Sequence, residues 1–207
     1  MAPFVSTATK ALILVANDLG QGVQESWANR SEEMQSLFRQ AFLPPQQTGQ
    51  PLMARYIVPI PNIAVNYDRK FVDAAMAGGP QTPSNYDVLK VGDLYVARHK
   101  GIVRRNITIV NFGLDVSSEQ AQEFGQAHKL GRTLDPWECF SIGEHRPMLN
   151  RELGFDYMAV VSLEKCEFGG ESRVCSCWWD EREREAALNW FTDGWHVRCW
   201  FGFVRES

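Results

Sequence analysis

The sequence lacks any long apolar run. No stretch among its 207 residues approaches the roughly 20 apolar residues that a membrane-spanning helix needs. The most apolar segment near the N-terminus, Ala11 to Ala16, is too short to form the core of a secretory signal. We therefore expect a protein of the cytoplasm or another intracellular compartment, with no membrane partner.

An excess of positive charge is also missing. Lys and Arg number 21 against 25 Asp and Glu, which gives a formal net charge of -4. Because proteins that bind nucleic acids usually present a basic face, we do not expect a nucleic-acid partner. Five potentially cationic residues lie close together in the sequence, and we call them the basic cluster: Arg98, His99, Lys100, Arg104 and Arg105. The basic cluster predicts either a solvated strand edge or a patch that binds an anion.

Cysteine is scarce and unevenly placed. The five cysteines are Cys139, Cys166, Cys175, Cys177 and Cys199. An odd number, with none in the first two-thirds of the chain, argues against a disulfide framework. Cys175 and Cys177 are one residue apart, and no second Cys or His pair completes a tetrahedral set. We therefore expect no zinc or other metal, no cofactor, and reduced thiols that pack as small apolar groups.

One pair of residues has the composition of a nucleophilic site. Cys139 and His145 lie on either side of a predicted helix-to-loop junction. A cysteine nucleophile needs a base within reach and a third group that orients the base. No orienting group is evident, so we interpret Cys139 as a buried structural thiol beside Trp137 and Phe140, with catalysis as the alternative.

The segment Ile13 to Gly20 (ILVANDLG) resembles the opening of two enzyme families. SurE-type nucleotidases begin with a strand and an Asn-Asp-Asp-Gly turn, and YdjC-type carbohydrate deacetylases have an Asn-Ala-Asp-Asp turn there. The resemblance implies a metal held by paired aspartates. Only Asn17 and Asp18 match, Leu19 stands in place of the second aspartate, and the families' histidines are missing downstream. An ordinary strand-to-helix turn explains the same residues.

Turn residues and prolines divide the first part of the chain. Lys10 to Ala16 predicts a short strand or the first turns of a helix. Gln21 to Phe42 has apolar residues at helical spacing and predicts one or two helices. The proline-rich stretch 43–51 and the Gly- and Pro-containing stretch 77–85 predict loops or arms.

The middle of the chain contains strand signals. Arg55 to Val65 is rich in β-branched residues, but Pro59 and Pro61 cannot donate ladder hydrogen bonds. This segment therefore predicts an edge strand or an extended arm. Tyr86 to Arg98 and Ile102 to Phe112 predict a hairpin whose turn carries the basic cluster.

Two helices follow with clear start signals. Ser117 begins a segment that runs to Leu130, where Gly131 is placed to end it. Asp135 and Pro136 supply an N-cap and a proline at the first helical position, which predicts a short helix over Trp137 to Gly143. A further turn is expected over 147–153.

The last 50 residues carry the strongest strand pattern. Four strand-like runs, separated by turn signals, predict an antiparallel β-meander. The runs are Tyr157 to Phe168, Ser172 to Trp179, Glu185 to Thr192 and Trp195 to Val204.

A two-residue turn at Asp193-Gly194 would set the register of the last hairpin. It pairs Trp190 with Val197, Leu188 with Cys199, and Ala186 with Phe201. One face of this hairpin would then be apolar and form core.

The opposite face of that hairpin is our candidate site. It would combine Asn189, His196, Arg198 and Trp200, which supply amide, imidazole, guanidinium and aromatic groups. Such a set suits an anionic or planar ligand, through charge and stacking. The alternative is that a helix or another chain packs over it, because aromatic residues and Arg are typical of interface cores.

These patterns predict a single α+β domain over residues 1–207. Its C-terminal meander would be packed by helices from the N-terminal and central segments, 21–42 and 117–143. The proline-rich arms, and five of the seven tryptophans within the last 30 residues, indicate surfaces that contact other chains. We therefore expect a non-enzymatic assembly or protein-interaction subunit, as in a multi-subunit or viral particle, with a protein partner or a homo-oligomer. The alternative is a small-molecule binding protein or enzyme that uses the C-terminal sheet face.

Overall fold

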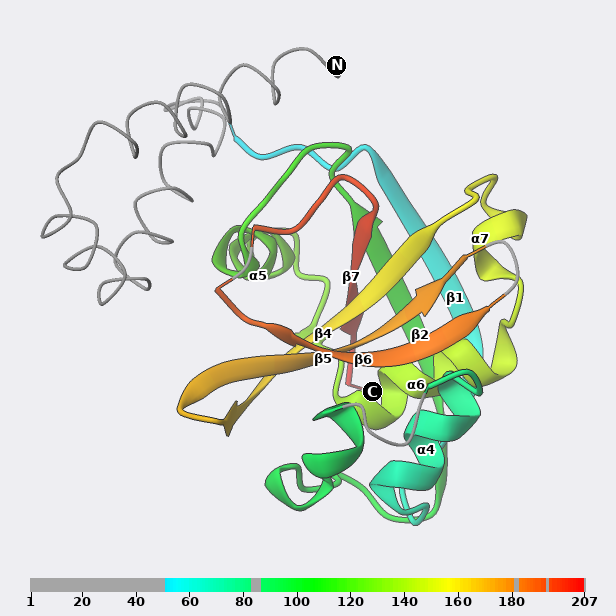
Figure 1. The fold of residues 1–207 in the computed structure, drawn as a ribbon. Coiled ribbons are helices and arrows are strands. Elements are labelled where there is room, and N and C mark those ends of the chain that lie inside the picture. Colours follow the sequence, from blue (N-terminus) through cyan, green and yellow to red (C-terminus); the bar gives the residue numbers. More distant parts are fainter. Residues whose placement is uncertain (1–50, 83–86, 181–182, 193, 207) are drawn as a thin grey trace, which may run out of the picture. The chain divides into compact units, whose positions relative to one another are not determined.

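The computed structural model describes residues 51–82, 87–180, 183–192 and 194–206 (Figure 1). The elements predicted at 10–16 and 21–42 lie outside these residues, as does the turn at Asn17 and Asp18. Almost all of the loop predicted at 43–51 also lies outside them.

A seven-stranded sheet forms the centre of this part of the chain (Figure 1). Its strands are β1 (Tyr56–Asn66), β2 (Ile102–Asn111), β3 (Arg132–Thr133), β4 (Met158–Phe168), β5 (Glu171–Trp179), β6 (Arg184–Trp190) and β7 (Cys199–Val204). The order across the sheet is β1-β2-β7-β4-β5-β6, and β3 pairs with the end of β7. Neighbouring strands are antiparallel except β4 and β7, which are parallel. The α+β class is confirmed, with a sheet that is mixed.

Short helices connect the strands. They are α4 (Phe71–Gly78), the 3-10 turns η1 (Asp87–Lys90) and η2 (Gly92–Leu94), α5 (Ser118–Ala127), α6 (Pro136–His145) and α7 (Leu149–Glu152). Both predicted N-caps are present. Ser117 accepts from the backbone of Gln120, and Asp135 accepts from the backbone of Glu138, each within a capping box. Within the described residues, no helix is long and apolar enough to cross a membrane.

Helix α4 was missed by the sequence analysis. Its sequence, FVDAAMAG, is short and contains three alanines, and the predicted loop at 77–85 overlapped its last turn. The loop instead follows the helix from Gly79. Two helical glycines allow α4 to approach α6 closely: a Cβ on Gly143 would lie 2.4 Å from the Gly78 carbonyl oxygen.

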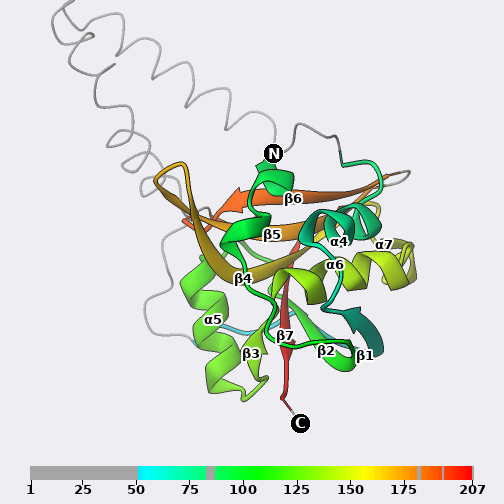
Figure 2. The ribbon, with the colours of Figure 1, turned by 90° about the horizontal axis from the view of Figure 1, so that it is seen from below.

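Helices cover both faces of the sheet (Figure 2). On one face, α4 and α6 pack on a core that includes Met158, Val160 and Trp200. On the other face, α5 packs through Ala121 and Phe124. Side chains along a strand alternate between the two cores, so an inner strand must be apolar at every position.

Strand β7 is the inner strand that the sequence analysis misplaced. All six of its residues are buried, with Phe201 and Phe203 in one core and Trp200 in the other. It lies between β2 and β4, on the far side of β4 from β6. The predicted hairpin of 185–192 with 195–204 is therefore wrong. As an outer strand next to β6, β7 would have left apolar surface in water, whereas the central position buries both faces.

The chain reaches this central position through the segment between β6 and β7. Phe191 and Trp195 are buried within it, and Trp195 pairs with Val116 ahead of α5. The Trp195 indole N–H donates to the Ser118 hydroxyl at 2.7 Å. These contacts carry the chain across one face of the sheet instead of turning it back on itself.

The predicted register between residues 185–192 and 195–204 is also wrong, because these two segments do not pair. Strand β6 pairs only with β5 among the described strands, so that Trp190 lies opposite Arg173 and Leu188 opposite Cys175. Trp190 is 40% exposed and Val197 39% exposed, so the prediction that both belong to the core is wrong.

The first predicted hairpin is also corrected. Strand β2 matches the predicted strand 102–112, but the described residues of 86–98 form η1, η2 and irregular backbone. The partner of β2 is β1, which lies at the edge of the sheet, as its prolines predicted. A register shift between Ile60 and Ile63 accommodates Pro61.

Candidate functional site

The four residues of the predicted site do not share a sheet face. His196 and Arg198 lie exposed in the segment before β7, while Trp200 is in β7 and only 1% exposed. Trp200 stacks on Tyr56 and meets Phe155 edge-on in the core, with centroid distances of 5.8 Å and 5.5 Å. The predicted juxtaposition of Trp200 with Arg198 is therefore wrong, because it depended on the Asp193-Gly194 hairpin.

Asn189 lines a hollow of about 410 Å³ on the outer part of β5 and β6. We call this feature the acidic hollow. It is lined by Tyr157, Trp178, Asp180, Glu183, Glu185, Ala187, Leu188 and Asn189. The antiparallel register places Trp178 opposite Glu185 and Val174 opposite Asn189 on the same face of the sheet. On this face Val174 belongs to the same core as Ala121 and Phe124 of α5, and the hollow lies further along the two strands, around Trp178 and Glu185.

One wall of the acidic hollow is aromatic and held in place by hydrogen bonds. The Tyr157 and Trp178 rings lie 5.4 Å apart. The Trp178 indole N–H donates to the Ser176 hydroxyl at 2.7 Å, and that hydroxyl donates to the Asn189 side-chain oxygen at 2.6 Å. This chain of bonds fixes both the indole and the amide, which gives the hollow a preformed surface.

Three carboxylates give the hollow its negative charge. Asp180 accepts a hydrogen bond from the Glu183 backbone N–H, which holds these two residues together, and Glu185 lies beside them. Burial raises the pKa of Tyr157, and the negative charges of Asp180 and Glu185 act in the same direction. The phenol therefore stays neutral, and the face of its ring attracts positive charge.

Arg198, although exposed, lies near this hollow. Its guanidinium carbon is 5.6 Å from the centre of the Tyr157 ring. The structure thus relates two of the predicted residues, Asn189 and Arg198, through Tyr157, which was not predicted. The predicted meander already placed the run 172–179 beside the run 185–192, but no register was predicted for this pair, and the register is what places Trp178 opposite Glu185.

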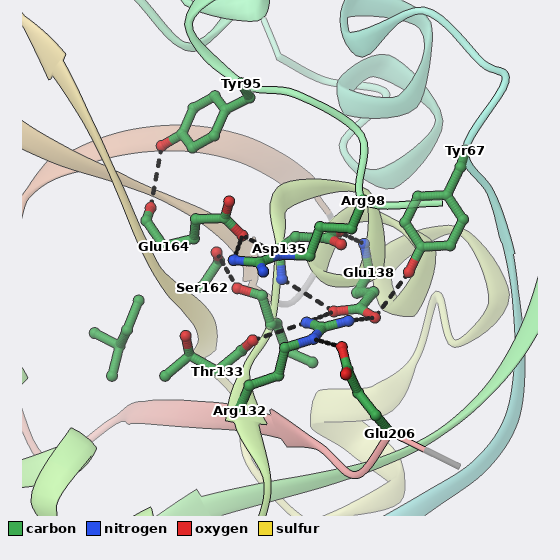
Figure 3. Close-up of polar contacts among 12 residues, drawn as sticks. Tyr67, Tyr95, Arg98, Arg132, Thr133, Asp135, Glu138, Ser162, Glu164 and Glu206 are labelled. Carbon is green, nitrogen blue, oxygen red and sulfur yellow. Dashed lines mark hydrogen bonds and ion pairs between the residues drawn. The ribbon is translucent and has the colours of Figure 1, made fainter. Parts of the chain in front are cut away.

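A second polar group lies in the interior, where α6 begins (Figure 3). Its centre is Glu138, whose side chain is fully buried. Arg132 holds both carboxylate oxygens, at 2.7 Å and 2.8 Å. The Tyr67 hydroxyl donates to the carboxylate at 2.8 Å, and the Arg105 Nε lies 3.3 Å from it. We call these four residues the buried cluster; their contacts join β2, β3, α6 and the residue that directly follows β1.

Asp135 lies beside the buried cluster as the N-cap of α6. It is 1% exposed, and one of its oxygens accepts the Glu138 backbone N–H at 2.9 Å. Its other oxygen is buried and has no hydrogen-bond partner among the described residues. Burial, with the neighbouring charge of Glu138, raises the pKa of Asp135 to about 7.

The basic cluster does not form a hairpin turn. Arg98 pairs with Glu164 at 3.1 Å, Arg104 donates to Asn62, and Arg105 points inward to Glu138. The His99 ring lies against Tyr67, with ring centroids 5.1 Å apart. Arg105 is therefore part of both the basic cluster and the buried cluster, and His99 contacts the buried cluster through Tyr67.

The cysteine and histidine considered as a nucleophilic pair have different partners. The Cys139 thiol is fully buried and donates to the Val160 carbonyl, and burial raises its pKa. His145 contacts the Ala64 carbonyl with its Nε2 atom, 2.9 Å away. All five thiols are buried, and none is in a disulfide. Within the residues that the structure describes, no three His, Cys, Asp or Glu side chains form a set that could hold a metal.

Comparisons of the chain with protein-family models, with curated proteins and with solved structures found no match.

Proposed function

We propose that the protein is a non-enzymatic interaction subunit, and that its acidic hollow receives a lysine or arginine side chain from a protein partner. The observation that carries this proposal is the combination of Tyr157 and Trp178 with three carboxylates in one hollow of about 410 Å³. Aromatic faces and carboxylates both attract a cation, and the apolar stem of Lys or Arg packs on the rings.

The lining residues favour binding over nucleophilic catalysis. None of the eight residues that line the hollow is a histidine, cysteine, serine or lysine. Binding of an acidic or nucleic-acid partner there would bring like charges together, which costs free energy. The net charge of -4 acts in the same direction and attracts a basic partner over a longer range.

Another tryptophan of this protein already contacts a cation. The guanidinium carbon of Arg173 lies 3.9 Å from the centre of the Trp190 ring, and the Trp190 indole donates to Glu171. An aromatic ring, a carboxylate and an arginine thus occur together on β5 and β6. The acidic hollow also combines aromatic rings with carboxylates, and a lysine or arginine of the partner would add a cation to that set.

The test is a titration of the full chain with N-acetyl-lysine amide and N-acetyl-arginine amide. Binding is followed by the indole N–H signals in NMR spectra. We expect the Trp178 signal to shift, and Trp178→Ala or Glu185→Gln to weaken binding by about tenfold, the scale of one desolvated cation–π contact or charge pair. Trp190→Phe is the matched control and should bind normally. Equal binding by the wild type and Trp178→Ala would refute the proposal.

The same experiment identifies the kind of partner. If a second copy of the chain supplies the cation, sedimentation will show a concentration-dependent mass above 23.5 kDa that Trp178→Ala abolishes. If a different protein supplies it, the mass will stay at 23.5 kDa while the amino-acid amides still bind. Choline, a small organic amine, tests the alternative. If choline binds far more tightly than both amides, the result favours a small-molecule binding protein over a protein-interaction subunit.

A further inference from the structure

Strand β6 forms one edge of the sheet, so half of its backbone groups point away from β5 (Figure 2). In an antiparallel pair, alternate residues bond to the neighbouring strand. The Phe191 N–H donates to the Ser172 carbonyl of β5, and the register of the two strands continues this alternation through β6. The residues whose backbone groups point outward are therefore Arg184, Ala186, Leu188 and Trp190.

The chain's own residues occupy the first half of this edge. Arg184 and Gln81 exchange hydrogen bonds, and the Thr82 hydroxyl bonds both the N–H and the carbonyl of Ala186. The outward backbone groups of Leu188 and Trp190 have no hydrogen-bond partner among the described residues. We call these backbone groups the β6 edge. They are the kind of groups with which a further strand pairs.

The opposite edge of the sheet is protected against such pairing. Pro59 and Pro61 of β1 have no N–H group, and His145 Nε2 contacts the Ala64 carbonyl at 2.9 Å. Strand β6 has no proline, and no charged residue after Glu185. Prolines and charges are the usual protection of an edge strand, so their absence here indicates an edge that accepts a partner.

The β6 edge borders the acidic hollow. Ala187 and Asn189, on either side of Leu188, both line the hollow. Leu188 lines it too, although its side chain packs against the core on the other face of the sheet. A strand paired with the β6 edge would therefore place every second side chain beside the hollow. A side chain opposite Ala187 would lie diagonal to Glu185, within reach of a lysine or arginine.

The remaining side chains of such a strand would meet apolar surface. Trp190 is 40% exposed and Leu188 is half-buried, and both point to the face opposite the hollow. Apolar side chains directly across from them would pack on them, and β-branched residues pair well with an aromatic ring. The β6 edge thus favours a segment whose apolar residues alternate with others, with a cation at the end near Glu185.

We propose that the partner's lysine or arginine enters the acidic hollow from an extended segment that pairs antiparallel with the β6 edge. This inference rests on the proposed function and adds the form of the partner. Backbone hydrogen bonds would supply affinity, and the alternate side chains would supply specificity. The carboxylates of the hollow select a basic segment over an acidic one. Antiparallel pairing is the more stable of the two kinds of ladder.

The test uses the peptide acetyl-Val-Thr-Val-Lys-amide and the full chain. The two valines would lie opposite Trp190 and Leu188, and the lysine opposite Ala187. We expect the peptide to bind at least about tenfold more tightly than N-acetyl-lysine amide, because it adds backbone hydrogen bonds. Hydrogen exchange at the amides of Leu188 and Trp190 should slow with the peptide and not with the amino-acid amide. The Ala187 and Asn189 amides, which face β5, are internal controls.

Two N-methylated peptides are the matched controls. Methylation of the second valine nitrogen removes the N–H group that would bond to Leu188, and should weaken binding by about tenfold. Methylation of the threonine nitrogen, which would face away from β6, should leave binding nearly unchanged.

The outcomes separate this inference from the proposed function. If N-acetyl-lysine amide shifts the Trp178 signal but the two methylated peptides bind equally, strand pairing is refuted and the hollow remains a cation site. If neither the amide nor the peptide shifts the Trp178 signal, both proposals fail. If a second copy fills the edge, the chain will sediment above 23.5 kDa with the Leu188 and Trp190 amides protected before peptide is added, which would overturn the partner segment.

Discussion

The rings of Trp200 and Tyr56 stack on each other, with their centroids 5.8 Å apart and an angle of 22° between their planes. The contact joins the central strand to the edge strand β1. Trp200 is 1% exposed, whereas Trp190, also on a strand, is 40% exposed. The two tryptophans should therefore respond very differently to truncation.

We expect Trp200→Ala to lower the free energy of unfolding by about 3–5 kcal/mol, because it leaves a large cavity in the core beside Tyr56 and Phe155. Trp190→Ala should cost about 1 kcal/mol or less, since its ring is partly in water. Urea unfolding measured by circular dichroism checks both values. Equal costs for the two variants would contradict this placement of β7.

A second prediction concerns the centre of the buried cluster. Glu138→Gln removes the charge that Arg132 and Arg105 share, and it turns an N–H group towards them. We expect a loss of about 3–5 kcal/mol in the free energy of unfolding, the usual cost of breaking a buried ion pair on one side. Glu152→Gln, which breaks an exposed pair, should cost about 1 kcal/mol or less. A cost below about 1 kcal/mol for Glu138→Gln would show that the cluster contributes little.

Asp135 gives a prediction about pH. Its pKa rises from an ordinary value of 3.8 to about 7 on folding. Between these two values the folded chain keeps a proton that the unfolded chain has lost. The stability contributed by protonated Asp135 is therefore present at low pH, and it is lost as pH rises towards 7.

Asp135→Asn should remove this dependence while keeping the N-cap, because Asn caps helices as well as Asp does. The free energy of unfolding of the variant, relative to wild type, should rise as pH increases from about 4 to about 7. Denaturant unfolding at several pH values measures it. Parallel curves for the two proteins would mean that Asp135 titrates normally.

At the crossing of α4 and α6, we expect a glycine-to-alanine substitution to lower the free energy of unfolding instead of raising it. Alanine in place of glycine normally stabilises a helix by about 1 kcal/mol. A Cβ on Gly143 would instead lie 2.4 Å from the Gly78 carbonyl oxygen and 2.6 Å from the Cys177 sulfur. We expect Gly143→Ala to cost about 1–3 kcal/mol, as overpacking does.

The control is Gln126→Ala on the exposed side of α5, which should change the free energy of unfolding by about 0.5 kcal/mol or less. Thermal unfolding of both variants is sufficient. A Gly143→Ala protein that is more stable than the wild type would show that the two helices are less close than described.

The features that the sequence predicted correctly are those with local causes. Ser117 and Asp135 cap their helices by contacts within three residues, and Pro59 marks β1 as an edge strand. Each of these signals depends only on residues that are close together in the sequence. Such signals survive in any tertiary arrangement.

The central position of β7 has no such local cause. The turn signal at residues 193 and 194 favoured a hairpin, but Cys199–Val204 has no polar alternation, which is typical of a strand buried on both faces. The parallel partner, β4, is some 40 residues away in sequence, a pairing that no local pattern encodes.

The candidate sites follow the same division. Asn189 was predicted and lines the hollow, but Tyr157 and Trp178 join it through strand pairing. Glu138 was not singled out by the sequence analysis. Its burial among Arg105, Arg132 and Tyr67 depends on three separate segments of the chain and could not be derived from spacing.

The last of the described strands, β7, occupies the middle of the sheet. During synthesis, β1 and β2 can pair soon after they leave the ribosome, and so can β4, β5 and β6. Among the described strands, only β7 joins these two halves. Until residue 204 has emerged, the nascent chain therefore carries the open edges of β2 and β4, each able to pair with a neighbouring polypeptide. The order of the strands therefore makes the pairing of β7 the step that completes this sheet, and the two open edges need protection until that step.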